Sequence, residues 1–300
     1  MSTLLPINDS LQRAGNLRGL WYMVAGFASF SCADIMAKIL TADYHPVQIA
    51  WTRQFGVVAV MLVILLLKGP ALLRSVAPYT QMLRGMFGVV SAVCFIFAIR
   101  YVPLADAVAV SFIAPFIVTV LGATLLGEVV GLRRWVAVTI GFIGTIVIVR
   151  PGLGIFHPAI FLVVVAAIAF AGRQIVSRHI GKRDPTLTTL VYTAMTSFII
   201  LVPPLFFFWH TPENATHLAL MVGLTLLSGL GEFLIIKALE IAHVVVVSPM
   251  HYSLIIFSTF WGYLVYGDFP DLWTWVGTLI VVSSGLYIIR EQSRKIYPPR

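Results

Sequence analysis

Charged residues are scarce in this sequence. Asp, Glu, Lys and Arg together make up 11% of its 300 residues, against roughly 25% in soluble globular domains. So few charges cannot cover the surface of a soluble protein of this size. Hydrophobic residues make up 59%, which excludes a disordered chain. The composition therefore predicts a polytopic membrane protein.

Cysteine is rare, and the motifs of several chemistries are absent. Cys32 and Cys94 both lie within apolar runs, so they predict neither a disulfide framework nor a zinc site. The sequence has no Gly-x-x-x-x-Gly-Lys motif for ATP and no His-Glu-x-x-His motif for zinc. The net charge of +8 is spread between apolar runs and forms no stripe, so we expect no nucleic-acid partner. We also expect no metal and no cofactor.

Ten apolar runs are long enough to cross a bilayer as helices, because a hydrocarbon core about 30 Å thick needs about 20 residues. Barrel strands are excluded, since they are about 10 residues long and strictly alternate. Short turns rich in Pro and Gly separate the runs. The expected spans are 19–40, 46–67, 79–99, 104–125, 132–149, 157–180, 188–209, 216–238, 244–266 and 272–290.

The distribution of basic residues predicts the orientation. If the N-terminus lies inside, the inner segments hold fourteen Lys and Arg, and the outer loops hold only Lys38, Arg100 and Arg150. The positive-inside rule then places both termini in the cytoplasm. Residues 1–18 are polar and lack the pattern of a cleaved signal. We therefore expect cytoplasmic tails over 1–18 and 291–300.

The two halves of the chain resemble each other. An offset of 140 residues aligns them without a gap, with ten identities over the 53 residues 98–150. Glu128 then lies opposite Asp268, and Lys38 lies opposite Arg178. Each half carries five spans, an odd number, so the second half is predicted to be inverted. Inverted repeats are typical of alternating-access transporters, whose substrate site lies near the midplane between the repeats. The expected repeats are residues 19–150 and 151–290.

The segment Ala98–Pro103, followed by Pro115 and the Leu126–Glu128 turn, resembles the hallmark of the EamA-type repeat of the drug/metabolite transporter superfamily. The second copy is similar from Ala238 to Asp268, although Ile255 stands where the proline is expected. The resemblance implies an all-α fold of ten transmembrane helices and a secondary transporter of the bacterial inner membrane. Members export amino acids and other small metabolites. Aromatic amino-acid exporters of the YddG type are the first expectation.

Five charged residues lie well inside predicted spans, away from the span ends, where each charge costs about 2.5–3.5 kcal/mol. Asp34 and Arg53 lie at similar depth in the outer half of the membrane. Arg84, Arg173 and Glu232 lie in the inner half. One interpretation is a pair of gates that open alternately. The other is that fixed pairs hold the helices together, or that Arg84 and Arg173 extend to the headgroups.

Uncharged polar side chains lie between these two layers, and they are candidates for the substrate cavity. They are Gln54, Ser91, Ser111, Tyr192, Thr196, His251, Tyr252 and Ser253. A pocket of this kind, with no central charge pair, predicts a small net-neutral solute. Neutral and aromatic amino acids therefore rank above nucleotide sugars, whose phosphates demand clustered Arg or Lys. Three interpretations of His251 stay open: it binds the substrate, it carries a proton, or it is an interior histidine whose hydrogen bonds are satisfied within the protein.

Two prolines are candidate hinges. Pro115 removes a backbone hydrogen bond within a span, which indicates either a hinge at the cavity wall or a packed kink. Pro249 lies in the corresponding span of the second repeat. Glu128 is interpreted as a structural acid of its loop. The fifth and tenth spans carry small residues and no central charge, so they are expected at the periphery, against the other repeat or a second protomer. Monomer and homodimer both stay open.

Three other classes of membrane protein compete with a transporter. An intramembrane serine protease needs a Gly-x-Ser-x-Gly turn, but Ser228-Gly229 lacks the preceding glycine, and His251 lies on another span. A channel would carry a filter or a charged ring, and an ATP-driven pump would carry a nucleotide motif. We therefore expect no enzyme activity. Besides amino acids, other metabolites or drugs remain alternative substrates, and the bilayer and the small-molecule substrate are the expected partners.

Overall fold

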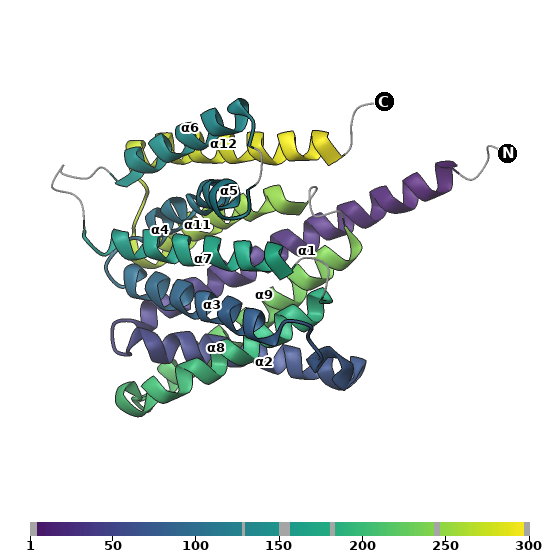
Figure 1. Ribbon diagram of the computed structural model, residues 1–300. Coiled ribbons are helices and arrows are strands. Elements are labelled where there is room, and N and C mark those ends of the chain that lie inside the picture. Colours follow the sequence, from purple (N-terminus) through teal and green to yellow (C-terminus); the bar gives the residue numbers. More distant parts are fainter. Residues whose placement is uncertain (1–4, 128–129, 150–156, 181–183, 243–246, 297–300) are drawn as a thin grey trace.

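The computed structural model describes residues 5–127, 130–149, 157–180, 184–242 and 247–296. Within these ranges all regular structure is helical (Figure 1). Glu128 and the turns at 150–152 and 182–183 lie outside the described residues. The helices are α1 (Leu5–Leu40), α2 (Pro46–Lys68), η1 (Pro70–Leu73), α3 (Pro78–Ile99), α4 (Leu104–Ser111), α5 (Ala114–Leu125), α6 (Leu132–Val149), α7 (Ile160–Ile180), α8 (Thr186–Phe208), α9 (Ala215–Ile241), η2 (Ser248–Tyr252), α11 (Ser253–Tyr266) and α12 (Leu272–Ile296), where η marks a 3₁₀-helix.

Seven of the predicted spans are helices long and apolar enough to cross a membrane within the described residues. They are α1, α2, α3, the stretch formed by α4 and α5, α7, α8 and α9. The other three predicted spans correspond to shorter apolar helices: Trp135–Val149 of α6, Leu272–Ile288 of α12 and the 14-residue α11. The first helix begins at Leu5, so part of the expected N-terminal tail continues α1 as helix.

The fourth and ninth spans are both interrupted, at corresponding places. In the first repeat α4 ends at Ser111 and α5 begins at Ala114. In the second repeat the 3₁₀-helix η2 ends at Tyr252 and α11 begins at Ser253, and the 140-residue offset maps Phe112 onto Tyr252. Pro115 is the second residue of α5, where its missing N–H costs no helical hydrogen bond. The proline therefore starts a new helix instead of kinking a continuous one.

Helix packing repeats between the two halves. Helix α1 packs against α9, and its counterpart α7 packs against α3, the counterpart of α9. In the same way α2 contacts α9 and α8 contacts α3, while α1 contacts α11 and α7 contacts α5. These contacts mostly join one half of the chain to the other. The bundle thus has the approximate two-fold symmetry that an inverted duplication produces.

Small residues let the helices approach closely at positions that this symmetry relates. Gly56 of α2 lies against the backbone of Thr225 in α9. The 140-residue offset aligns Gly56 with Thr196 of α8 and Thr225 with Gly85 of α3, and these two residues are also in contact. A Cβ atom on Gly85 would lie 2.6 Å from the Cβ atom of Thr196. Such small-residue contacts drive helix association in membranes, because lipid chains are as apolar as leucine.

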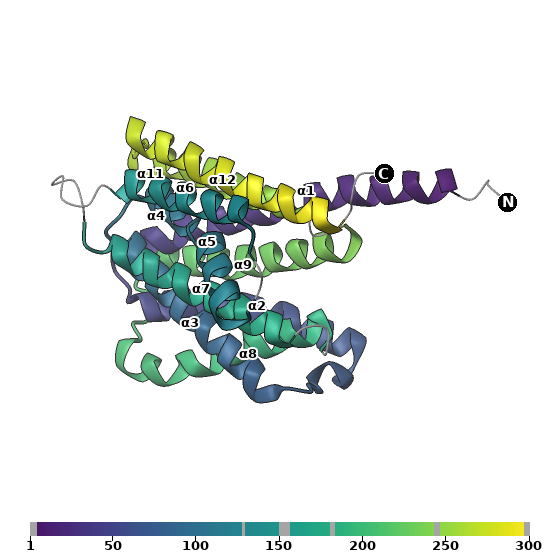
Figure 2. The ribbon, with the colours of Figure 1, turned by 45° about the horizontal axis from the view of Figure 1, so that its top comes forward.

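Helices α6 and α12 form a pair at one edge of the bundle, as their sequences predict (Figures 1 and 2). They pack mainly against each other, and they contact the rest of the protein through α4, α5 and η2. The first turns of α1 and the last turns of α12 lie at the same end of the molecule. The helical bundle therefore brings both ends of the chain to one side.

The turn before α8 is fixed by Asp184. Its Oδ2 atom accepts hydrogen bonds from Ser75 Oγ at 2.5 Å and Gln81 Nε2 at 2.8 Å, and Oδ1 accepts one from Val76 N at 2.9 Å. Burial raises the pKa of the Asp184 carboxyl, but these hydrogen bonds outweigh burial and hold its pKa below the ordinary value. The carboxylate thereby ties the start of α8 to the turn that precedes α3.

We predict that Gly56→Ala lowers the melting temperature of the protein in detergent. Alanine favours a helix over glycine by about 1 kcal/mol, but here its Cβ overlaps the backbone of Thr225, which cannot move aside as a side chain can. Overpacking of this kind costs about 1–3 kcal/mol. Gly131→Ala is the control, because a Cβ at Gly131 meets nothing within 4 Å. Equal melting temperatures for the two variants would refute the contact.

Candidate substrate site

The interior of the bundle holds an ion pair between Asp34 of α1 and Arg53 of α2. Arg53 Nη1 donates to Asp34 Oδ1 at 2.5 Å, and Asp34 is only 4% exposed. The guanidinium of Arg53 also lies over the Phe30 ring, 5.2 Å from its centroid. The interaction predicted from the similar depth of the two residues is therefore present.

Arg84 of α3 is bound on several sides by polar groups of other helices. Its Nε atom donates to Ser177 Oγ of α7 at 2.6 Å, and Nη1 donates to the Thr189 carbonyl of α8 at 3.3 Å and to Thr193 Oγ1. The side chain is buried and does not extend to the headgroups. These contacts favour a fixed link between α3, α7 and α8.

Arg173 of α7 and Glu232 of α9 lack direct partners. In the part of the chain that the structure describes, neither side chain makes an ion pair or a hydrogen bond, and Arg173 Nε is a buried donor without an acceptor. The Arg173 guanidinium lies 4.8 Å from the centroid of the Phe170 ring. Glu232 interacts electrostatically with Arg173, although the two do not touch. Two opposite charges thus lie within electrostatic range of each other without a direct contact in the described residues.

The two charge layers expected from the sequence are linked. Glu232 interacts electrostatically with Arg84 and also with Arg53, which belongs to the other layer. Glu232 is therefore within electrostatic range of charges from both layers.

His251 lies at the helix interruption of the second repeat, beside this charge cluster. The residue as a whole is exposed. It stacks on Phe27 of α1, with centroids 4.6 Å apart, and meets Phe112 edge-on at 5.7 Å. Arg173 interacts with it electrostatically. The rings of Phe112 and Tyr252, two residues that the 140-residue offset aligns, also pack together, with their centroids 5.0 Å apart. The two interruptions therefore meet, and paired interruptions in the two halves of a transporter indicate the substrate site.

The remaining cavity candidates mostly tie helices together. Gln54 Nε2 donates to the Ala194 carbonyl of α8 at 3.4 Å. Tyr192 donates to the Leu73 carbonyl of η1 at 2.8 Å, so its hydroxyl lies at the end of the bundle and not at its midplane. Thr196 packs on Gly85, as described above.

Three further candidates contact their own helix or a peripheral one. Ser111 Oγ donates to the Val108 carbonyl, and Ser253 Oγ donates to the Met250 carbonyl. The Tyr252 hydroxyl lies against Gly285 of α12 and so points away from the charge cluster. Ser91 is half-buried on α3. Pro249 is the second residue of η2.

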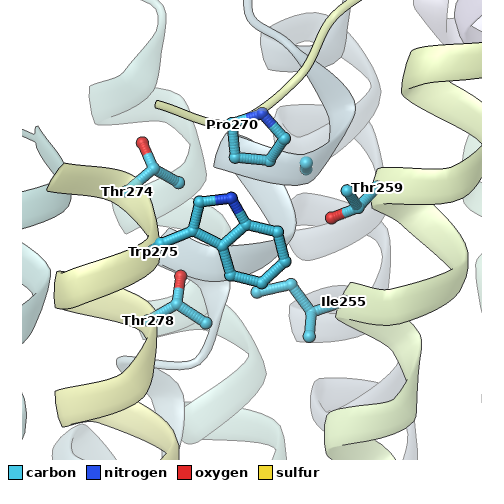
Figure 3. Close-up of a pocket in the computed structure, with 7 residues that line it drawn as sticks. Ile255, Thr259, Pro270, Thr274, Trp275 and Thr278 are labelled. Carbon is cyan, nitrogen blue, oxygen red and sulfur yellow. The ribbon is translucent and has the colours of Figure 1, made fainter. Parts of the chain in front are cut away.

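A small hollow between α11 and α12 does not serve as a substrate site. Figure 3 shows the indole of Trp275 within it, between Thr278 on one helix and Thr259 on the other. The hollow encloses about 170 Å³ in all and leaves no room for a water molecule. The hydroxyls of Thr259 and Thr278 are buried there without a described hydrogen-bond partner. A solute of metabolite size does not fit.

Sequence reasoning missed the contact of Lys38. Its ammonium is buried at the end of α1, where it donates to the Val102 carbonyl at 3.1 Å and to Asp268 Oδ2 at 3.4 Å. The Tyr266 ring centroid lies 4.6 Å from the nitrogen. The contact joins the first half of the chain to the α11–α12 turn of the second half. The sequence did carry a signal for these two positions. The 140-residue offset aligns Lys38 with Arg178 and Asp268 with Glu128, so each position keeps the sign of its charge in both halves.

The profile of the EamA-like transporter family matches residues 17–150 and again residues 157–290. The S-adenosylmethionine uptake transporter of Rickettsia prowazekii is 27% identical over 290 residues, covering 97% of this chain and 98% of that protein. The riboflavin transporter of Vibrio cholerae is 26% identical, covering 92% and 94%. The pseudopaline exporter of Pseudomonas aeruginosa is 25% identical, covering 91% and 96%. A crystal structure with 17% identity superposes with a TM-score of 0.62 over 95% of this chain and 99% of that one, which shows a common fold.

We predict that the Asp34–Arg53 pair is strongly coupled and that its two members are not equivalent. Arg53→Gln leaves the buried Asp34 without a partner, and breaking a buried pair in this way costs about 3–5 kcal/mol. Asp34→Asn is milder, because Arg53 still interacts with Glu232. The double variant should lose less stability than the sum of the two single losses, as measured by thermal unfolding in detergent. Strictly additive losses would show that the two side chains do not interact.

Proposed function

The chain belongs to the EamA-like transporter family, and on this basis we propose that it carries a small metabolite with an amino-acid head group by alternating access. It is a multi-pass protein of the bacterial inner membrane, and its family consists of transporters, not of enzymes. The similar proteins carry S-adenosylmethionine, riboflavin and pseudopaline. These solutes differ widely, so the substrate class has to be argued from the site.

The open charges of Arg173 and Glu232 carry the proposal. A guanidinium binds a carboxylate through two parallel hydrogen bonds, and a carboxylate binds an ammonium group through charge-assisted ones. An α-amino acid group presents both charges a few ångströms apart, and it would satisfy Arg173 and Glu232 together. A buried, unpaired charge is costly, so binding such a group relieves both residues at once. A purely apolar drug would leave both unsatisfied.

Aromatic rings around the charges favour a substrate with a planar or cationic body. Phe27, Phe112 and the His251 ring form a cluster at the helix interruption, and Phe170 lies beside Arg173. S-adenosylmethionine combines an amino-acid group with an aromatic base and a sulfonium cation, which aromatic faces attract. It is our first candidate. The aromatic amino acids expected from the sequence share the head group and the ring, and they are the second candidate, with export as their proposed direction.

Alternating access requires contacts between the halves to break. The Lys38–Asp268 contact joins the end of α1 to the α11–α12 turn, so we propose that it holds one end of the bundle closed. The interruptions at Phe112 and Tyr252, near Pro115 and Pro249, are the proposed hinges, because a broken helix bends at less cost than a continuous one. With both termini in the cytoplasm, as the basic residues predict, the Lys38 end faces outward.

The first test removes the open charges. We expect Arg173→Gln and Glu232→Gln to lower S-adenosylmethionine counterflow in proteoliposomes by about tenfold to a hundredfold, since a hydrogen bond to a charged group contributes about 1.5–3 kcal/mol. Glu240→Gln is the matched control, because Glu240 lies on the same helix but is exposed and paired with Lys237 at 2.9 Å. Wild-type counterflow by folded Arg173→Gln and Glu232→Gln proteins would exclude the proposed site.

The second test locks the outer contact. In a background with Cys32→Ser and Cys94→Ser, we expect the double variant Lys38→Cys/Asp268→Cys to lose counterflow severalfold when a short bifunctional methanethiosulfonate reagent joins the two thiols, and to regain it on reduction. The reagent replaces the length of the lysine side chain, which a direct disulfide would not span. Lys38→Cys alone controls for modification by the reagent. A cross-linked protein that transports as fast as the reduced one would show that this end does not open.

A further inference from the structure

A second concave surface lies far from the charge cluster, on the α6–α12 pair. It is a groove of about 700 Å³. The two helices touch where a Cβ on Gly277 would lie 2.6 Å from the Gly144 carbonyl oxygen, and the Ser284 hydroxyl donates to the Ala137 carbonyl at the floor. The lining residues fall within 132–140 and 279–287, on one side of the glycine contact. The groove therefore has a closed end and an open end.

The wall of the groove is apolar and faces outward. Leu132 is 80% exposed and Leu279 is 68% exposed, and Val136 and Ile140 of α6 continue the lining. From Leu132 to Ile140 the helix rises about 12 Å. One leaflet contributes about half of a hydrocarbon core roughly 30 Å thick. The apolar lining thus spans most of the depth of one leaflet.

The open end of the groove is basic. Arg133, in the first turn of α6, lines the groove with an exposed side chain, and the Tyr287 ring lies across from it on α12. Arg290, three residues further along α12, is exposed too. Arginine and tyrosine at this level lie at the membrane–water interface, where lipid phosphates are found.

We propose that this groove binds an anionic phospholipid of the surrounding leaflet. Its phosphate binds Arg133, and an acyl chain follows the apolar wall towards the Gly144–Gly277 contact. Basic grooves between membrane helices attract acidic headgroups in this way. A second copy of the chain is a poorer occupant, because a two-fold interface would bring the Arg133 side chains of both copies to the same depth. A zwitterionic lipid would fit the wall but gain less from Arg133.

Native mass spectrometry tests the headgroup. Protein is exchanged into detergent that contains phosphatidylglycerol or phosphatidylcholine with identical chains. We expect the wild type to retain phosphatidylglycerol preferentially, and Arg133→Gln to retain it about fivefold less, which corresponds to the loss of one basic residue near an acidic headgroup. Retention of phosphatidylcholine should not change. Arg100→Gln, which removes an exposed cation at the end of α3, is the matched control.

Filling the groove tests the acyl chain. Val136→Trp should lower the retention of both lipids severalfold, and Ser283→Trp fills the groove from α12 if the first variant does not fold. Wild-type phosphatidylglycerol retention in folded Arg133→Gln protein would overturn the proposal. A wild-type dimer that Val136→Trp converts to monomer would also overturn it, because a second copy would then be the occupant.

Discussion

A charge inside a bilayer has to face the protein interior and find a partner, and the core of this bundle is arranged around that constraint. Asp34 meets Arg53, and Arg84 is bound by groups of α7 and α8. Arg173 and Glu232 interact only through space within the described residues. The first set holds helices together. The second set lacks such direct contacts, and the proposed function rests on that difference.

The scaffold follows the two-fold symmetry of the duplication, whereas the five charges deep within the spans do not. The contact of Gly56 with Thr225 has a symmetry mate in that of Gly85 with Thr196. Arg173 and Glu232, however, correspond to Ala33 and Ala92 in the first repeat. Packing contacts between the halves are therefore duplicated, whereas these two charges occur in the second half alone. We infer that the repeat supplies the alternating architecture, while unpaired substitutions on α7 and α9 supply the selectivity.

The sequence predicted features that depend on position along the membrane normal. Apolar runs of about 20 residues located the spans, and equal depth identified Asp34 and Arg53 as partners. Contacts that depend on which helices are neighbours were not predicted. Lys38 binds Asp268, 230 residues away in the chain, and the Tyr192 hydroxyl turns to η1 instead of the midplane. The sequence placed Glu232 in the inner layer, but depth alone does not reveal that α9 brings it within electrostatic range of both α2 and α7.

The central claim is that the site recognises a carboxylate and an ammonium group on the same solute. Competition against labelled S-adenosylmethionine counterflow by the wild-type protein tests it most directly, with two analogues as competitors, one lacking the carboxylate and the other lacking the amino group. The account predicts that each deletion weakens competition about tenfold or more, since each leaves a charge of the site unpaired. An analogue without the carboxylate that competes as well as the intact solute would contradict it.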